Sequence, residues 1–190
     1  MRRRLVLLVC LLTAAGFAAD MVAYTDSNST EATSGPYRAE HQHNWADRYD
    51  SSIIHRWPAR SIFWSRNDYS HIRLFRDDRE VFRKPTIAIN ELLLFPEEQL
   101  VFGISDVKGR NPYQLVVYDF EGKLLHAASM ADREGLSETS TNFRTWKKRE
   151  TPLQLTCTDG RVSGFRYVDV DENSQTYQFP KPLPHACRSE

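Results

Sequence analysis

Hydrophobic and polar residues alternate in short runs through much of the chain, and turn-forming residues separate the runs. The clearest segment covers residues 86–130, where two pairs of apolar runs flank the turn sequences at 96–98 and 119–122. A two-residue period places successive side chains on opposite faces of a strand, while Pro, Gly and Asp between runs favour tight turns. The pattern predicts most of a four-stranded antiparallel meander in this segment.

Other parts of the chain repeat this alternation. Further strands are predicted at residues 71–75, 139–146, 152–157, 161–170 and 175–179. Asp159 and Gly160 form a strong hairpin signal between two of them. At most one short helix is expected, over residues 45–54, because Trp45, Tyr49 and Ile53 recur every four positions. The sequence therefore predicts a mainly β fold, an antiparallel meander or sandwich of about eight to nine short strands without an internal repeat.

The N-terminus has the layout of a secretory signal. Three arginines at positions 2–4 precede an apolar run that ends in small residues, and Asp20 interrupts the run after fifteen residues. A helix that spans a bilayer needs about 20 apolar residues. We therefore interpret residues 1–18 as a cleaved signal peptide, with a mature chain that begins at Ala19. The alternative is an uncleaved membrane anchor over residues 5–24.

The remaining chain is expected to divide into a leader, a domain and a tail. Residues 19–40 contain many turn formers and no apolar period, which predicts a flexible leader. Residues 41–190 are of ordinary size for a single mainly β domain. Its C-terminal tail contains prolines at 180, 182 and 184, which cannot donate to a strand ladder, so the tail is expected to run extended over the surface.

Composition narrows the function classes. The chain has 25 basic and 25 acidic residues, and loss of a signal with three arginines leaves the mature chain slightly acidic. A nucleic-acid binder would need a basic surface, so this class is disfavoured. An aromatic content of 12% and a hydrophobic content of 41% indicate a folded core.

Two cysteines remain after removal of the signal. Cys157 follows a predicted strand, and Cys187 lies in the proline-rich tail. In an oxidising compartment two such cysteines pair more often than they bind metal. A disulfide between Cys157 and Cys187 is therefore expected to attach the tail to the sheet.

Metal sites have only weak support in the sequence. His41 and His43 would share one face of an extended segment, and imidazole suits zinc or copper, but no third ligand follows at a helpful spacing. Residues 169–173 place oxygens as at the start of a calcium loop, but Ser174 and Pro180 occupy the positions of its glycine and glutamate. We predict a turn at residues 171–174, and neither a metal nor another cofactor.

Aromatic residues and arginines are interleaved from Trp45 to Phe82. Tryptophan faces and arginine forks are common at binding surfaces. The residues that we select as binding candidates are Arg56, Trp57, Arg60, Trp64 and Arg66. The alternative is that the aromatic rings fill the core while the arginines line strand faces.

No Gly-x-Ser-x-Gly elbow, Ser-x-x-Lys motif or glycine-rich phosphate loop is present in the sequence. We therefore expect an exported, periplasmic or secreted, non-catalytic β domain that binds a protein partner in the cell envelope or outside the cell. An envelope glycan-binding module is one alternative. A hydrolase built from dispersed histidines and carboxylates is another. Contact with a membrane is expected only through an uncleaved N-terminal segment.

Overall fold

The computed structural model of this chain describes residues 27–44, 70–106, 113–130, 137–138 and 144–187. All regular secondary structure in these ranges is β-strand, which confirms the mainly β prediction. They contain no helix that is long and apolar enough to cross a membrane. The expected signal peptide and the short helix at 45–54 lie outside them.

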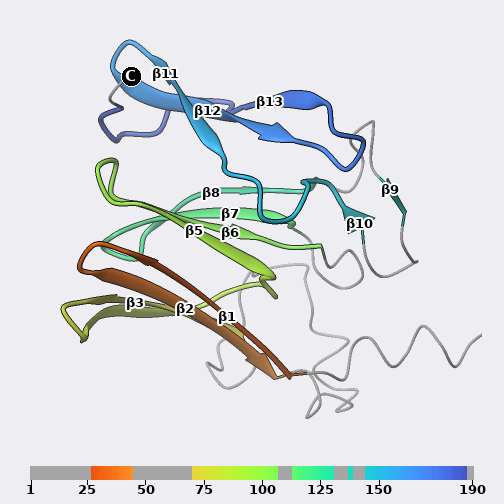
Figure 1. The fold of residues 1–190 in the computed structure, drawn as a ribbon. Coiled ribbons are helices and arrows are strands. Elements are labelled where there is room, and N and C mark those ends of the chain that lie inside the picture. Colours follow the sequence, from red (N-terminus) through yellow and green to blue (C-terminus); the bar gives the residue numbers. More distant parts are fainter. Residues whose placement is uncertain (1–26, 45–69, 107–112, 131–136, 139–143, 188–190) are drawn as a thin grey trace, which may run out of the picture.

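Three antiparallel sheets are stacked face to face (Figure 1). The N-terminal sheet contains β1 (Ser27–Ser34), β2 (Tyr37–Asn44), β3 (Ser70–Arg76) and β4 (Arg79–Pro85). The middle sheet contains β5 (Glu91–Phe95), β6 (Leu100–Ile104), β7 (Leu115–Asp119) and β8 (Leu124–Ala128). The C-terminal sheet contains β11 (Gln154–Thr158), β12 (Arg161–Val168) and β13 (Ser174–Gln178). A short pair, β9 (Ser137–Glu138) and β10 (Arg144–Thr145), completes the described strands. Neighbours in sequence are neighbours in each sheet, so each sheet is a meander.

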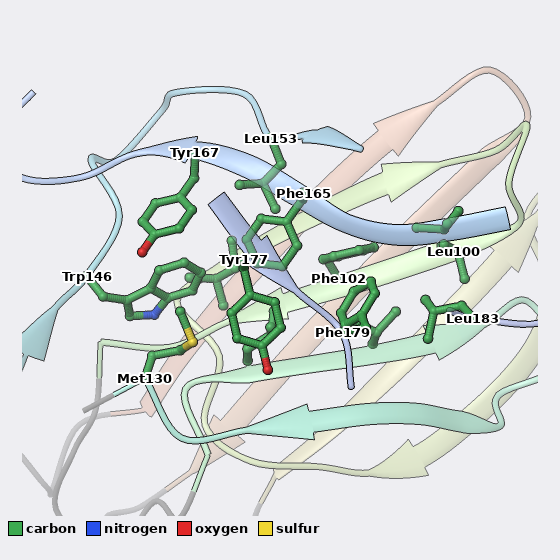
Figure 2. Close-up of a cluster of buried hydrophobic side chains, with 14 residues drawn as sticks. Leu100, Phe102, Met130, Trp146, Leu153, Phe165, Tyr167, Tyr177, Phe179 and Leu183 are labelled. Carbon is green, nitrogen blue, oxygen red and sulfur yellow. The ribbon is translucent and has the colours of Figure 1, made fainter. Parts of the chain in front are cut away.

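The middle sheet is buried on both faces. Every residue of β6 and β7 is buried, and alternate side chains enter two different cores. Phe102 packs towards the C-terminal sheet, in the cluster shown in Figure 2, while Val101 and Val116 pack towards the N-terminal sheet. Gly103 lies between them, where a Cβ atom would approach Ile89 Cδ1 to 2.5 Å. Double burial explains why β6 and β7 are nearly continuous apolar runs in the sequence.

The two outer faces of the stack are polar. On the N-terminal sheet, Arg73 donates to Glu80 at 2.7 Å and to Glu40 at 3.2 Å, and Arg38 also pairs with Glu40. The guanidinium groups of Arg38 and Arg73 cover the ring of Phe75 at 4.2 and 4.4 Å. On the C-terminal sheet, an exposed polar row is formed by Gln154, Arg166 and Thr176. Polar outer faces are typical of the last layer of a stack, and no further sheet covers them among the described residues.

The flexible leader predicted over residues 19–40 is wrong for residues 27–40. These residues form β1 and most of β2, which pair along their whole lengths and join β3. Few apolar side chains mark this hairpin, because Ala32 and Ala39 are small, and Tyr37 adds one aromatic ring beside polar residues such as His41 and His43. The hairpin makes the described strands more numerous than the eight or nine expected.

The C-terminal tail is held more firmly than the sequence suggested. The Leu183 amide donates to the Val162 carbonyl at 2.8 Å, and the Cys187 amide donates to the Gly160 carbonyl at 2.9 Å. The prolines remove donors only at their own positions, so the residues between them still bond to β12. Cys157 and Cys187 lie at disulfide distance, with Cα atoms 5.7 Å apart, as expected.

The N-terminal and middle sheets follow the same path, although the sequence suggested no repeat. In both, the last strand carries one residue without a partner across the ladder, Val81 in β4 and Leu125 in β8. Such bulges twist an edge strand and protect it from pairing with another chain. The two sheets therefore share the same topology and register, while their side chains differ.

The two ends of the stack are different (Figure 1). At one, the turn end, strands are joined by tight turns at residues 35–36, 77–78, 96–99, 120–123 and 159–160. At the other, the connection end, the chain leaves β2, β6 and β8 and returns as β3, β7 and β11. These longer connections comprise residues 45–69, 105–114 and 129–153.

Candidate functional site

Most of the buried polar residues of the described chain lie at the connection end. They are His41, His43, Ser70, Thr86, Ser105, Asp106, Gln114 and Lys147. A buried polar group is costly unless it is hydrogen-bonded, so such a concentration needs a network to hold it. We therefore take the connection end as the candidate functional site.

Residues 86–90 connect the N-terminal sheet to the middle sheet across this end. The Ser70 hydroxyl donates to the Ile87 carbonyl at 2.8 Å, and the Tyr118 hydroxyl donates to Thr86 Oγ1 at 3.0 Å. Burial raises the pKa of Tyr118, and the hydrogen bond with Thr86 acts in the opposite direction. Tyr118 therefore stays neutral and ties the connector to β7.

His41 is bound to the same connector. The Ile89 amide donates to His41 Nε2 at 3.0 Å, and His43 Nδ1 lies 3.1 Å from the same nitrogen. Burial and the neighbouring His43 hold the pKa of His41 well below its ordinary value, while the backbone carbonyl of His71 acts in the opposite direction. Because an amide can only donate, Nε2 is an acceptor and the neutral ring carries its proton on Nδ1.

The two metal candidates, His41 and His43, do share one face of β2. The structure gives them no further ligand, since the described ranges hold no group of three or more His, Cys, Asp or Glu residues arranged for a metal ion. His41 Nε2 already accepts from the Ile89 amide.

Two ion pairs fasten the segment before β11 to this end. Lys147 Nζ donates to both carboxylate oxygens of Glu91, at 2.9 and 3.0 Å, and to the Lys148 carbonyl at 3.1 Å. Arg149 Nη2 donates to the buried Asp106 at 2.8 Å. All three ammonium hydrogens of Lys147 have acceptors, so this lysine is structural and is not poised as a nucleophile.

Two shallow hollows on the described surface have volumes of about 200 and 560 Å³. The smaller is lined by residues of β1, β2 and β3 that include Ser29, Glu40 and His71. Ser29 and His71 are separated by the intervening strand residue Gln42, which places them about 9–10 Å apart. Gln42, which lines the same hollow, lies between them.

The sequence that imitated a calcium loop forms a turn, as predicted. Asp169 Oδ1 accepts from the Asp171 and Asn173 amides at 3.0 and 2.8 Å, and Oδ2 accepts from the Gln175 side chain at 2.8 Å. The bond from Gln175, followed by those from the two amides, lowers the pKa of Asp169 against the effect of its burial. Both carboxylate oxygens therefore serve the turn.

The end of the aromatic and arginine-rich stretch can be followed in β3 and β4. Phe75 and Phe82 are buried, while Arg73 pairs with Glu40 and Glu80 on the outer face. Phe82 therefore fits the alternative, in which rings fill the core and arginines line strand faces, whereas Phe75 lies on the outer face beneath the guanidinium groups of Arg38 and Arg73.

The five binding candidates, Arg56, Trp57, Arg60, Trp64 and Arg66, lie outside the described residues. They belong to the connection that leaves β2 after Asn44 and returns at Ser70. Since His43 and Ser70 are paired in the sheet, both ends of that connection are fixed at the connection end.

Sequence reasoning missed the buried polar network. Ile89 lies 48 residues from His41, Glu91 lies 56 residues from Lys147, and Asp106 lies 43 residues from Arg149. Local periodicity carries no information on pairs at such separations. The only local sign is the polar inner face of β2 itself.

No protein-family model, curated protein or solved structure matches this chain. Its function must therefore be argued from its own geometry. That geometry offers a rigid sheet stack with several chain connections held at one end.

Proposed function

We propose that this chain is an exported, non-catalytic β domain that binds a protein partner in the cell envelope or outside the cell through its connection end. The observation that carries the proposal is the convergence of the longer connections at one end of a rigid stack. Binding residues are found disproportionately on loops that a rigid scaffold positions. The buried polar network fixes the strands from which these connections leave.

Export is supported by two independent features. Residues 2–19 read as the charged and apolar parts of a secretory signal. Cys157 and Cys187 lie at disulfide distance, which is compatible with an oxidising compartment.

The titratable groups at this end already form ion pairs and hydrogen bonds with other residues, which favours a binding role over catalysis. Glu91 and Asp106 are occupied by Lys147 and Arg149, and His41 is occupied by Ile89. These groups therefore supply rigidity.

The residues proposed to contact the partner are Arg56, Trp57, Arg60, Trp64 and Arg66. Tryptophan and arginine are enriched among residues that dominate binding energy, and truncating one typically costs about 2 kcal/mol or more. In the sequence they lie between His43 and Ser70, which are paired at the connection end.

The test is affinity capture from the native envelope fraction with residues 19–190 as bait, followed by mass spectrometry. Trp57→Ala and Trp64→Ala should each reduce recovery of the specific partner by about tenfold or more while the melting temperature stays unchanged. Val81→Ala is the matched control, because Val81 is a large exposed hydrophobic residue in β4.

Two results would contradict the proposal. One is equal capture by all variants. The other is retention of the bait by protein-free envelope polysaccharide with the same dependence on Trp57 and Trp64, which would identify a glycan-binding module instead.

A further inference from the structure

Each interface between two sheets contains a histidine whose Nε2 atom is hydrogen-bonded across it. Between the N-terminal and middle sheets, His41 Nε2 accepts from the Ile89 amide at 3.0 Å. Between the middle and C-terminal sheets, His126 Nε2 lies 2.8 Å from the Tyr177 hydroxyl. His41 is 1% exposed, whereas His126 is half-buried.

Protonation of the histidine affects these two hydrogen bonds differently. A tyrosine hydroxyl both donates and accepts, so it can rotate and accept from a protonated His126. The Ile89 amide can only donate, so a proton on His41 Nε2 removes its acceptor. His41 Nε2 would then donate to His43 Nδ1, which lies 3.1 Å away, and the Ile89 amide would be left without a partner.

We propose that His41 is an acid-operated latch, in which protonation breaks the Ile89 hydrogen bond and loosens the packing of the N-terminal sheet on the middle sheet. Ile89 is itself fully buried and contacts the middle sheet at Gly103. A buried amide without an acceptor is destabilising, and a buried charge without a counter-ion is more so. Opening this interface exposes the amide and the charged ring to water, which removes both of these costs.

Glu31 and Glu40 line the same shallow hollow as His41, and Glu40 is already paired with Arg38 and Arg73. The titratable groups that act on His41 are His43, from its own strand, and His71, from β3. The element packed from the middle-sheet side contributes the neutral Ile89 amide.

The direction of the pH effect follows from linkage. Burial lowers the pKa of His41 below its ordinary value of 6.5, so the closed state binds the proton more weakly than the open state. As the pH falls below about 6.5, the open state takes up protons first and the closed state loses stability. The equilibrium constant for opening rises up to tenfold per pH unit until the pH reaches the lowered pKa.

Hydrogen exchange of residues 19–190 at pH 7.5 and pH 5.0, corrected for intrinsic exchange rates, tests the latch. In the wild type, protection of the Ile89 amide should fall about tenfold or more at pH 5.0, while the amides of β13 change less. His41→Gln keeps an acceptor at the position of Nε2 and does not titrate, so its Ile89 protection should be independent of pH.

His126→Gln is the matched control and should show the wild-type loss of protection at Ile89. The same loss in His41→Gln, or no loss in the wild type, would overturn the proposal. If the His41→Gln variant fails to fold, the pH dependence of Ile89 protection in the wild type still tests the proposal. The ring nitrogen shifts of His41 and the amide proton shift of Ile89 must titrate together, and a protonated His41 with an unchanged Ile89 amide would also overturn the latch.

This inference does not depend on the proposed function, since its readout needs no partner. It concerns the same end of the molecule, because His43 adjoins the point where the chain leaves β2.

Discussion

Lys147 and Glu91, 56 residues apart in the sequence, form a buried ion pair in which the lysine side chain is 1% exposed. The pair joins the segment that precedes the C-terminal sheet to the first strand of the middle sheet. Together with the pair between Arg149 and Asp106, it closes the connection end against movement of this segment. A rigid base for the connections is what a binding role requires.

Glu91→Gln should destabilise the domain strongly, by about 3 kcal/mol, because it leaves the Lys147 ammonium buried without a counter-ion. The free energy of unfolding from urea titration measures this. Glu172→Gln is the control, since it removes the negative charge that pairs with the exposed Lys148 and should leave stability unchanged within error. A similar loss of unfolding free energy in both variants would show that burial of the Lys147 ammonium is not the cause.

The fold class could be predicted from the sequence because the strongest signal is local. In β6 and β7, both faces of the strand are apolar, and the turns between runs carry Pro, Gly or Asp. The β1–β2 hairpin could not be predicted in the same way. Its inner face holds small or polar residues such as Ala39 and His41, so alternation of hydrophobicity is absent although the strand register is complete.

The candidate site was only partly accessible to sequence reasoning. The proximity of His41 and His43 follows from their spacing in a strand, but their role follows from Ile89, which only the tertiary structure brings close. The buried ion pairs could not be predicted either, because the two partners of each pair come from different sheets or connections. Trp57 and Trp64 remain sequence-based candidates that lie outside the described residues.

Removal of the link between Cys157 and Cys187 should lower the free energy of unfolding by about 3 to 4 kcal/mol. The loop closed by the two cysteines spans 30 positions, and cross-linking a loop of this length restricts the unfolded chain by that amount. Cys157→Ser, Cys187→Ser and the double variant should all lose the same stability, as should the wild type in reductant. Two free thiols in the non-reduced wild type, detected by alkylation and intact mass, would contradict this.

Export can be tested with a reporter fused after residue 40. The fusion should cross the cytoplasmic membrane, and its mature N-terminus should map near Ala19, since small residues at 16 and 18 suit signal cleavage. Recovery of the full-length chain in the membrane fraction would favour the uncleaved anchor over residues 5–24. Retention of the reporter in the cytosol would contradict export altogether.

The central claim, that a protein partner binds at the connection end, is tested most directly by site-specific photo-crosslinking in the native host. A photoreactive p-benzoylphenylalanine would replace Lys148, an exposed residue at the connection end, or Glu121, an exposed residue at the turn end. We predict a discrete adduct with one protein from position 148 and none from position 121. An adduct from position 121 alone, equal adducts from both positions, or no adduct from position 148 would contradict the claim.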